Sequence, residues 1–350
     1  MADRNGSKVG PEMRPDLFKW HGTEVIFIPI MLATGILGNA LVLYITHFRW
    51  KISIFSFFIK VLAWLDMSNL VLAMPMLIVI TVHDDTPHFL PLCNCISFVA
   101  LFTAIASACV LVVIAANRFR KLCHPQRSQV TLPLAKKLTI GCFLFGVLTS
   151  VPTVWIFGQD TVSYNDDVSP VSISYCFIKR DAELALLVTW AVVMGATFLS
   201  VTVSLVVLYG FTILALRQHD KRISTMMRRP SAVSNNSKPS ISKKHTLVFI
   251  AVTVVFFVTY SPYFVTVILL LVDRSIESAM GPVAKAFFDL ARLVPMLSNV
   301  SNPIIYSFTS ERFRSECHKV FRLRPCMRLL NLQRKDSITA SHEMSQSEDS

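Results

Sequence analysis

Long apolar stretches, separated by short polar segments, dominate the chain. A helix of about 20 apolar residues crosses the roughly 30 Å hydrocarbon layer of a bilayer, and seven stretches reach that length. The predicted spans are approximately 24–47, 53–82, 96–116, 134–157, 184–216, 245–272 and 283–308. Backbone groups in lipid must be satisfied within the protein, which helices achieve. The pattern therefore predicts an all-α membrane protein with a bundle of seven transmembrane helices.

The segments outside the transmembrane domain 24–308 differ in composition. Residues 1–23 are polar and contain a glycosylation sequon at Asn5, which suits an outer tail. Residues 309–322 place apolar side chains on one helical face and predict a short amphipathic helix on the membrane surface. Residues 323–350 are rich in serine and acidic side chains and predict a disordered inner tail.

Composition and charge support a membrane protein and exclude several other classes. The chain is 53% hydrophobic and 16% charged, with a mean hydropathy of +0.53, whereas soluble domains carry about 25% charged residues. Nucleic acid is not the expected partner despite the net charge of +12, because most Lys and Arg flank apolar stretches, chiefly in 118–137, 217–244 and 312–335. This bias predicts a multi-pass membrane protein with an outer N-terminus and an inner C-terminus. The absence of P-loop, dinucleotide, HExxH and zinc-type cysteine motifs predicts no enzyme.

The eight cysteines are scattered along the chain. Cys93, Cys95 and Cys176 fall at predicted outer positions, so at most one disulfide is expected there. Near the inner membrane surface, Cys317 and Cys326 are candidates for palmitoylation, with unmodified thiols as the alternative.

Polar side chains also lie deep in the predicted spans, where each needs a partner. Asn39 interrupts the first span, and Asp66 lies near the middle of the second, where an unpaired carboxylate is costly. Ser107 falls on the face of the third span expected to meet Asp66. Arg118 ends the third span, where a snorkelling anchor is the alternative to a functional role.

Five short motifs occur in order, each in a different span. They are Gly38-Asn39, Leu62-Ala63-Trp64-Leu65-Asp66, Asn117-Arg118-Phe119 with Pro125, Phe256 with Tyr260 and Pro262, and Asn302-Pro303-Ile304-Ile305-Tyr306. Together they resemble the rhodopsin-like family of G protein-coupled receptors over roughly residues 24–322. The chain departs from that family at Asn117, which replaces an acidic residue, and at Tyr260, which replaces a tryptophan. Val201 stands where the fifth span usually carries a proline.

The resemblance implies a receptor that binds an extracellular ligand and acts on a heterotrimeric G protein, with arrestin and receptor kinases as further partners. It assigns G protein coupling and activation to Asn117, Arg118, Phe119, Tyr209, Asn302, Pro303 and Tyr306. It assigns a polar cluster that can hold a sodium ion to Asn39, Asp66, Ser107, Ser298 and Asn302. It assigns the aromatic switch below the ligand to Phe256, Tyr260 and Pro262. It also implies a disulfide between Cys93 and Cys176, for which Cys95 is a competitor.

Two positions narrow the ligand class. The resemblance places Ala100 where amine receptors carry an aspartate and Met296 where opsins carry the retinal lysine. A biogenic amine and a Schiff-base chromophore are therefore disfavoured. We expect a neuropeptide, with a small anionic or lipid-derived ligand as the alternative.

Three further residues are candidates for ligand contact, namely Tyr263, Phe264 and Arg292. Arg292 lies among apolar neighbours in the outer half of the seventh span, so its guanidinium is expected to point into the bundle. It is either a docking point for a ligand carboxylate or amide, or the partner of Asp289 in an internal ion pair.

Two rival classes receive less support. A secondary transporter would show an internal repeat or interrupted helices in matching halves, and neither is found. A membrane enzyme would need a nucleophile–base or metal constellation within the spans, and Asp66 has no evident catalytic partner.

Overall fold

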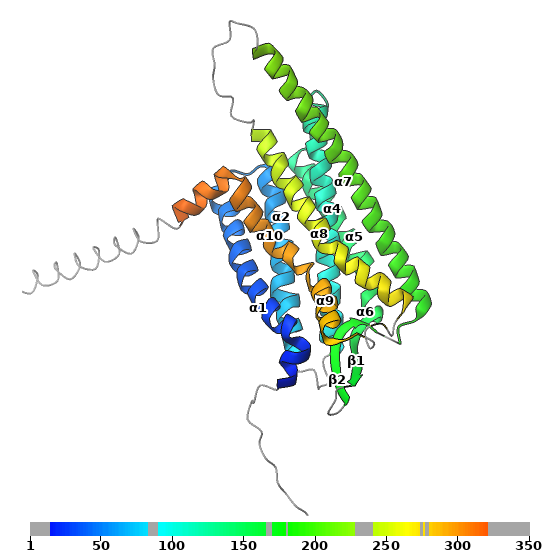
Figure 1. Cartoon of the computed structure of the whole chain (residues 1–350). Helices are drawn as coiled ribbons and strands as arrows, with labels where there is room; N and C mark the ends of the chain where they lie inside the picture. Colours follow the sequence, from blue (N-terminus) through cyan, green and yellow to red (C-terminus); the bar gives the residue numbers. More distant parts are fainter. Residues whose placement is uncertain are drawn as a thin grey trace, which may run out of the picture.

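The computed structural model describes residues 15–82, 90–165, 170–179, 181–227, 241–273, 276 and 280–320. These residues form a bundle of long helices with a β-hairpin at one end (Figure 1). The predictions for Asn5, Cys326 and the tail 323–350 lie outside the described residues.

Four of the predicted spans are single long helices, α1 (Pro15–Tyr44), α4 (Leu90–Cys123), α7 (Leu184–Met227) and α8 (Ile241–Val272). A short π-helix, η1 (Ile45–Arg49), continues α1. Two helices extend beyond the predicted spans, because α1 begins before Glu24 and α7 continues past Leu216 to Met227. Residues 217–227 contain no glycine or proline, so nothing in them ends the helix.

The second span has a wide turn in its middle. It consists of α2 (Ile54–Ser68), the π-helix η2 (Asn69–Ala73) and α3 (Met74–Val82). Pro75 lies just after η2, and its missing N–H and bulky ring account for the irregular hydrogen bonding there. The second span is therefore not one continuous α-helix.

Prolines also divide the fourth and seventh spans. The fourth is α5 (Leu132–Ser150) followed by the short α6 (Thr153–Ile156), and the seventh is α9 (Pro282–Leu293) followed by α10 (Met296–Thr309). Among the described residues, six helical stretches are long and apolar enough to cross a membrane by themselves, and the divided α9 and α10 supply the seventh. The predicted seven-helix bundle is confirmed.

Helix α4 lies at the centre of the bundle and packs against α2, α5, α7 and α8 (Figure 1). Many large apolar side chains of α5 and α7 point outward, among them Leu148 and Leu199, as expected for helices that face lipid. Helices α1 and α10 come especially close at Gly38, where an added Cβ would lie 2.8 Å from Cγ of Pro303. A larger residue at Gly38 would push these two helices apart.

The two ends of the bundle carry different structures. At one end, strands β1 (Phe157–Asn165) and β2 (Pro170–Ile178) form an antiparallel hairpin in which Gln159 faces Cys176. At the other end, residues 311–320 form the predicted C-terminal helix, which turns away from α10 (Figure 1). The hairpin lies between the predicted fourth and fifth spans and was not predicted from the sequence.

Candidate functional site

A disulfide holds the hairpin over the bundle. Cys93 at the start of α4 is bonded to Cys176 of β2, with Cα atoms 5.5 Å apart. Cys95, the predicted competitor, is exposed and free. The predicted pairing is confirmed.

Beneath the hairpin lies a cavity of about 150 Å³, which we call the outer cavity. Phe157 and Cys176 line it from the hairpin, Ala100 from α4, and Tyr263 from α8. Arg292 lines it from α9, so the guanidinium points into the bundle as predicted. Most of the remaining lining is apolar.

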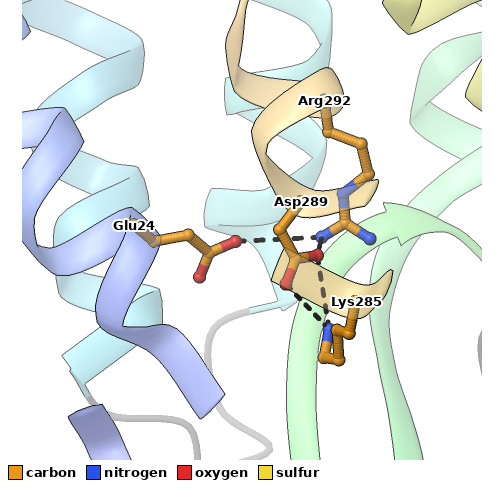
Figure 2. Close-up of polar contacts among 4 residues, drawn as sticks. All are labelled: Glu24, Lys285, Asp289 and Arg292. Atoms are coloured by element: carbon orange, nitrogen blue, oxygen red, sulfur yellow. Dashed lines mark hydrogen bonds and ion pairs between the residues drawn. The ribbon is translucent and has the colours of Figure 1, made fainter. Parts of the chain in front are cut away.

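Arg292 belongs to a network of four charged side chains at one side of the outer cavity (Figure 2). Its Nη2 lies 3.5 Å from Oδ1 of Asp289 and 3.9 Å from Oε1 of Glu24, on α1. Lys285 Nζ donates to both carboxylate oxygens of Asp289, at 3.0 and 3.3 Å. The ion pair between Arg292 and Asp289, one of the two predicted alternatives, is therefore present, and Arg292 faces the cavity as well.

A second cavity, of about 80 Å³, lies beside the first and has an almost wholly apolar lining. Trp190, Phe198 and Phe264 contribute its aromatic side chains, together with Phe256. Phe264 was expected at the same cavity as Arg292 but borders only this second one. The helical turn from Tyr263 to Phe264 directs the two side chains differently, and their rings make an edge contact with centroids 6.1 Å apart.

Tyr260 connects the cavities. Its ring stacks on Phe256 at 4.4 Å, and it lines both the outer cavity and the second cavity. It also lines a small polar cavity deeper in the bundle, so one side chain borders all three. The predicted switch residues Phe256 and Tyr260 thus lie together, and Pro262 lies within the same helix, α8.

The deep polar cavity, of about 10 Å³, surrounds Asp66. Asn302 Nδ2 donates to Asp66 Oδ2 at 2.7 Å, which joins α2 to α10. Ser107 and Ser298 also line the cavity, as predicted. The volume is close to the space one water-sized centre needs, and carboxylate and hydroxyl oxygens are suitable ligands for a hard cation. The residues present therefore fit a sodium ion.

Asn39, which was also predicted to belong to the polar cluster, does not line this cavity itself but bonds to Asn299, which does. Its Nδ2 donates to the backbone oxygen of Asn299 at 2.7 Å and to that of Gly35 at 3.1 Å. Asn39 therefore fastens α1 to α10. Thr103, which sequence reasoning missed, lines the cavity and accepts a hydrogen bond from Asn69 Nδ2 at 2.9 Å.

At the other end of α4, Arg118 is only 3% exposed and lies under two aromatic rings. Its Cζ is 5.7 Å from the ring centroid of Phe55 and 5.5 Å from that of Phe249. Both distances fall within the range of a cation–π interaction. Arg118 Nε has no hydrogen-bond partner among the described residues. Asn117 is buried beside it, and no hydrogen bond joins the two side chains.

The rings over Arg118 continue into a chain of aromatic contacts, which we call the aromatic chain. Phe249 of α8 packs on Phe55 of α2 at 5.4 Å between centroids, and Phe55 stacks on Trp50 at 5.8 Å. Trp50 meets Phe313 at 6.5 Å, and Phe313 meets Tyr306 of α10 at 6.1 Å. The aromatic chain links four helices at this end of the bundle. Aromatic side chains near span ends are usual at membrane interfaces, but sequence alone did not show that these five meet.

The other predicted coupling residues occupy different surroundings. Tyr209 of α7 is buried near Arg118. Phe119 turns toward α7, where its ring lies 6.0 Å from that of Phe211. Tyr306 is fully buried, and its hydroxyl makes no hydrogen bond with any described residue. Pro303 lies inside α10 against α1.

The helix formed by residues 311–320 is fastened to the bundle. Phe313 is buried in the core, and Arg49 Nε donates to Glu316 Oε2 at 2.9 Å. The hydrogen bond from Lys319 and that from Arg49 hold the pKa of the Glu316 carboxyl below its usual range. Cys317 is half-buried, and burial raises the pKa of its thiol.

Comparison with known proteins identifies the bundle. The profile described as "7 transmembrane receptor (rhodopsin family)" matches residues 38–306. Chemerin-like receptor 2 of Macaca fascicularis is 25% identical over 301 residues, which cover 84% of this chain and 78% of that protein. Thyrotropin-releasing hormone receptor of Bos taurus is 25% identical over 319 residues, which cover 85% of this chain and 77% of that protein.

Solved structures agree on the fold. The crystal structure of squid rhodopsin superposes with a TM-score of 0.70 at 18% identity, over 90% of each chain. At that identity the superposition shows the seven-helix architecture alone. The profile, in contrast, extends over most of the chain and contains all five motifs. The chain belongs to the rhodopsin family of seven-transmembrane receptors.

Proposed function

We propose that this protein is a plasma-membrane receptor that binds an extracellular peptide and promotes nucleotide exchange on a heterotrimeric G protein. The observation that carries the proposal is the pairing of an outer cavity under a disulfide-held hairpin with a covered arginine at the far end of α4. Arg118 is too deeply buried to reach another protein in this arrangement. A G protein would contact it only after Phe55 or Phe249 moves aside, so the arrangement corresponds to a resting receptor.

The relatives support a peptide ligand. One relative is named as a receptor for thyrotropin-releasing hormone, and another is named as a chemerin-like receptor. Ala100 lines the outer cavity without offering a carboxylate to an amine. A small anionic ligand is the second candidate, favoured by Arg292, but Glu24 lines the same cavity and would repel an anion.

Further roles follow from the same proposal. The hairpin end faces the extracellular side, and residues 311–320 lie at the cytoplasmic surface of the membrane, where Cys317 is available for palmitoylation. The tail 323–350 is proposed to serve receptor kinases and arrestin. The cavity around Asp66 is proposed to hold a sodium ion through Asp66, Ser107 and Ser298, which stabilises the resting arrangement.

The test uses purified receptor in lipid nanodiscs with purified heterotrimeric G proteins of the main subtypes. Receptor-dependent binding of a non-hydrolysable GTP analogue is measured for the wild type and for Arg118→Ala. We expect exchange above that of the G protein alone with at least one subtype, and its loss in Arg118→Ala. Arg120→Ala is the matched control, because Arg120 is an exposed neighbour that bonds only locally to Ser128. Equal exchange by all three proteins would show that Arg118 has no role in nucleotide exchange.

A further inference from the structure

The end of the bundle opposite the hairpin carries a stretch of chain with positive charge only. The sequence has no aspartate or glutamate from residue 86 to residue 159, which includes the end of α4, the loop after it and the start of α5. Arg120 in this stretch bonds to Ser128. Four other cations are exposed, and we call them the basic patch: Lys121, Arg127, Lys136 and Lys137.

A compact loop between α4 and α5 keeps the basic patch together. Arg120 Nη2 donates to the backbone oxygen of Ser128 at 2.8 Å, and Gln129 Nε2 donates to that of His124 at 3.1 Å. The side chain of Thr131 then caps the first turn of α5. The end of α4 and the start of α5 therefore lie close together, and the four cations share one small region.

The basic patch has no counter-charge in the part of the chain that the structure describes. None of its four side chains forms an ion pair there, whereas Glu316 of the C-terminal helix pairs with both Arg49 and Lys319. Helix α5 also has no acidic residue in its first turn, although negative charge is favourable at that end of a helix. Lys136 and Lys137 add positive charge one turn further on. Like charges repel, so an anion from outside the chain would stabilise this region.

An exposed apolar surface begins directly beside the basic patch. Residues four apart lie on one face of a helix, so Lys136, Ile140 and Leu144 form a row along α5. Ile140 and Leu144 are 58% and 67% exposed, and both belong to the candidate membrane span Leu132–Ile156. A cation at the end of an exposed apolar row matches a molecule that has an anionic head and acyl chains. Phospholipids have this structure, whereas a soluble anion would contact only the cations.

The number of cations favours a headgroup with several phosphates. A headgroup of one net negative charge, such as phosphoserine, would neutralise only one of the four side chains. A phosphorylated inositol ring carries several phosphates, which can accept from different side chains at once. Hydrogen bonds from lysine or arginine to phosphate are charge-assisted, and the guanidinium of Arg127 can donate two in parallel. Because the phosphates belong to one molecule, the later contacts form at a high effective concentration.

We propose that the basic patch binds the headgroup of a phosphoinositide lipid in the cytoplasmic leaflet, with the acyl chains against the exposed row of α5. None of the four residues lines the outer cavity, the second cavity or the polar cavity of Asp66. The lipid site is therefore separate from the ligand site. The inference rests on the orientation stated in the proposed function and not on coupling to a G protein.

The experiment counts the lipids bound to purified full-length receptor by native mass spectrometry. Receptor in detergent is mixed with equal amounts of phosphatidylcholine, phosphatidylserine and phosphatidylinositol 4,5-bisphosphate. We expect the phosphoinositide adduct to exceed the phosphatidylserine adduct at least ten-fold. Inositol 1,4,5-trisphosphate has the phosphates but no acyl chains, so it should displace the lipid only when present in at least ten-fold excess.

Three double substitutions separate a specific site from general attraction by charge. Lys136→Gln with Lys137→Gln should lower the phosphoinositide adduct at least ten-fold, whereas Lys136→Arg with Lys137→Arg should keep it within two-fold of the wild type. Arg314→Gln with Lys319→Gln is the matched control, because it removes the same charge from exposed positions of the C-terminal helix. All four positions are exposed, and each variant is compared as monodisperse receptor with a wild-type melting temperature.

The outcomes decide between the lipid site and its alternatives. A phosphoinositide preference that is lost only in the glutamine variant of Lys136 and Lys137 supports the inference. Equal binding of the two anionic lipids, or equal losses in that variant and the control, overturns it, because only total charge would then matter. Displacement by an equal concentration of inositol trisphosphate overturns the lipid as occupant. Lowered nucleotide exchange with unchanged lipid binding assigns the surface to the G protein instead.

The lipid measurement and the nucleotide-exchange assay are independent. Wild-type receptor that promotes exchange but shows no phosphoinositide preference refutes this inference alone. Wild-type receptor that binds the phosphoinositide but promotes exchange on no G protein refutes the proposed function and leaves the lipid site in place.

Discussion

Removing one ring from above Arg118 should make the receptor signal without ligand. Phe249 is fully buried, and its ring contacts both Phe55 and the guanidinium of Arg118. We choose Phe249→Leu because leucine keeps an apolar side chain in the core but has no aromatic face. The substitution therefore removes the two ring interactions while limiting the cavity it leaves.

The size of the effect follows from these two contacts. An aromatic pair contributes about 0.5–1.5 kcal/mol beyond its buried area, and a desolvated cation–π contact about 0.5–2 kcal/mol. Both contacts break when Phe249 moves aside, so together they favour the resting state by about 1–3.5 kcal/mol. A shift of this size changes a conformational equilibrium roughly 5–400-fold. We therefore expect at least a five-fold rise in basal exchange.

The assay measures the initial rate of GTP-analogue binding with purified receptor, lipid and G protein at fixed concentrations. Phe58→Leu is the matched control, because Phe58 is equally buried in the same core cluster but packs on Phe57 instead. It loses comparable packing and should leave basal exchange within two-fold of the wild type. If Phe249→Leu stays within two-fold as well, or if both variants rise equally, the aromatic cover does not hold the resting state.

Three other predictions concern the two ends of α4. Asn117→Asp should lower basal exchange several-fold, because a carboxylate adds a charged partner for Arg118 that Asn117 cannot supply; unchanged exchange at matched receptor amounts contradicts this. Arg118→Ala should abolish exchange yet leave the melting temperature close to that of the wild type, whereas a large decrease would indicate global disruption. Cys176→Ser should lower thermal stability, since a disulfide with a sequence separation of 83 stabilises by about 4.5 kcal/mol in the chain-entropy account. An unchanged melting temperature in nanodiscs would show that the hairpin holds its place without the bond.

The hydrophobic pattern predicted the spans well because lipid exposure constrains each helix separately. It placed both ends of α8 within four residues, whereas α4 begins six residues before the predicted apolar stretch and ends seven residues after it. It failed for α7, where charged residues follow the span but nothing terminates the helix before Met227. It also missed the hairpin, since β1 and β2 stabilise one another and neither carries a strong signal of its own. Pairing across a connection is a tertiary property that a single-segment pattern does not contain.

The sequence predicted those site residues that belong to recognised motifs. It did not predict contacts that depend on how each helix is rotated about its axis. The bond between Asn302 and Asp66 joins two motif residues that the resemblance had already placed together. No motif indicated that the side chain of Glu24 points into the bundle, because an acidic residue at the edge of a span usually lies in solvent. Only the orientation of α1 against α9 brings it to Arg292. The aromatic chain was missed for the same reason.

Shared cavities and side-chain contacts of the described residues connect the outer cavity with Arg118 at the other end of the bundle. Tyr260 borders the outer cavity and the polar cavity of Asp66, whose carboxylate accepts from Asn302. One helical turn further along α10, Tyr306 enters the aromatic chain that ends over Arg118. Such a route transmits a signal only if its elements have two discrete arrangements that ligand and G protein favour differently. Tyr306 meets part of that condition, because its buried hydroxyl makes no hydrogen bond with any described residue. A second arrangement in which this hydroxyl makes a hydrogen bond is stabilised by that bond. If ligand binding in the outer cavity favours the arrangement in which Arg118 is uncovered, then G protein binding at Arg118 must raise the affinity of that cavity for the ligand by the same factor, because coupling between binding sites is reciprocal.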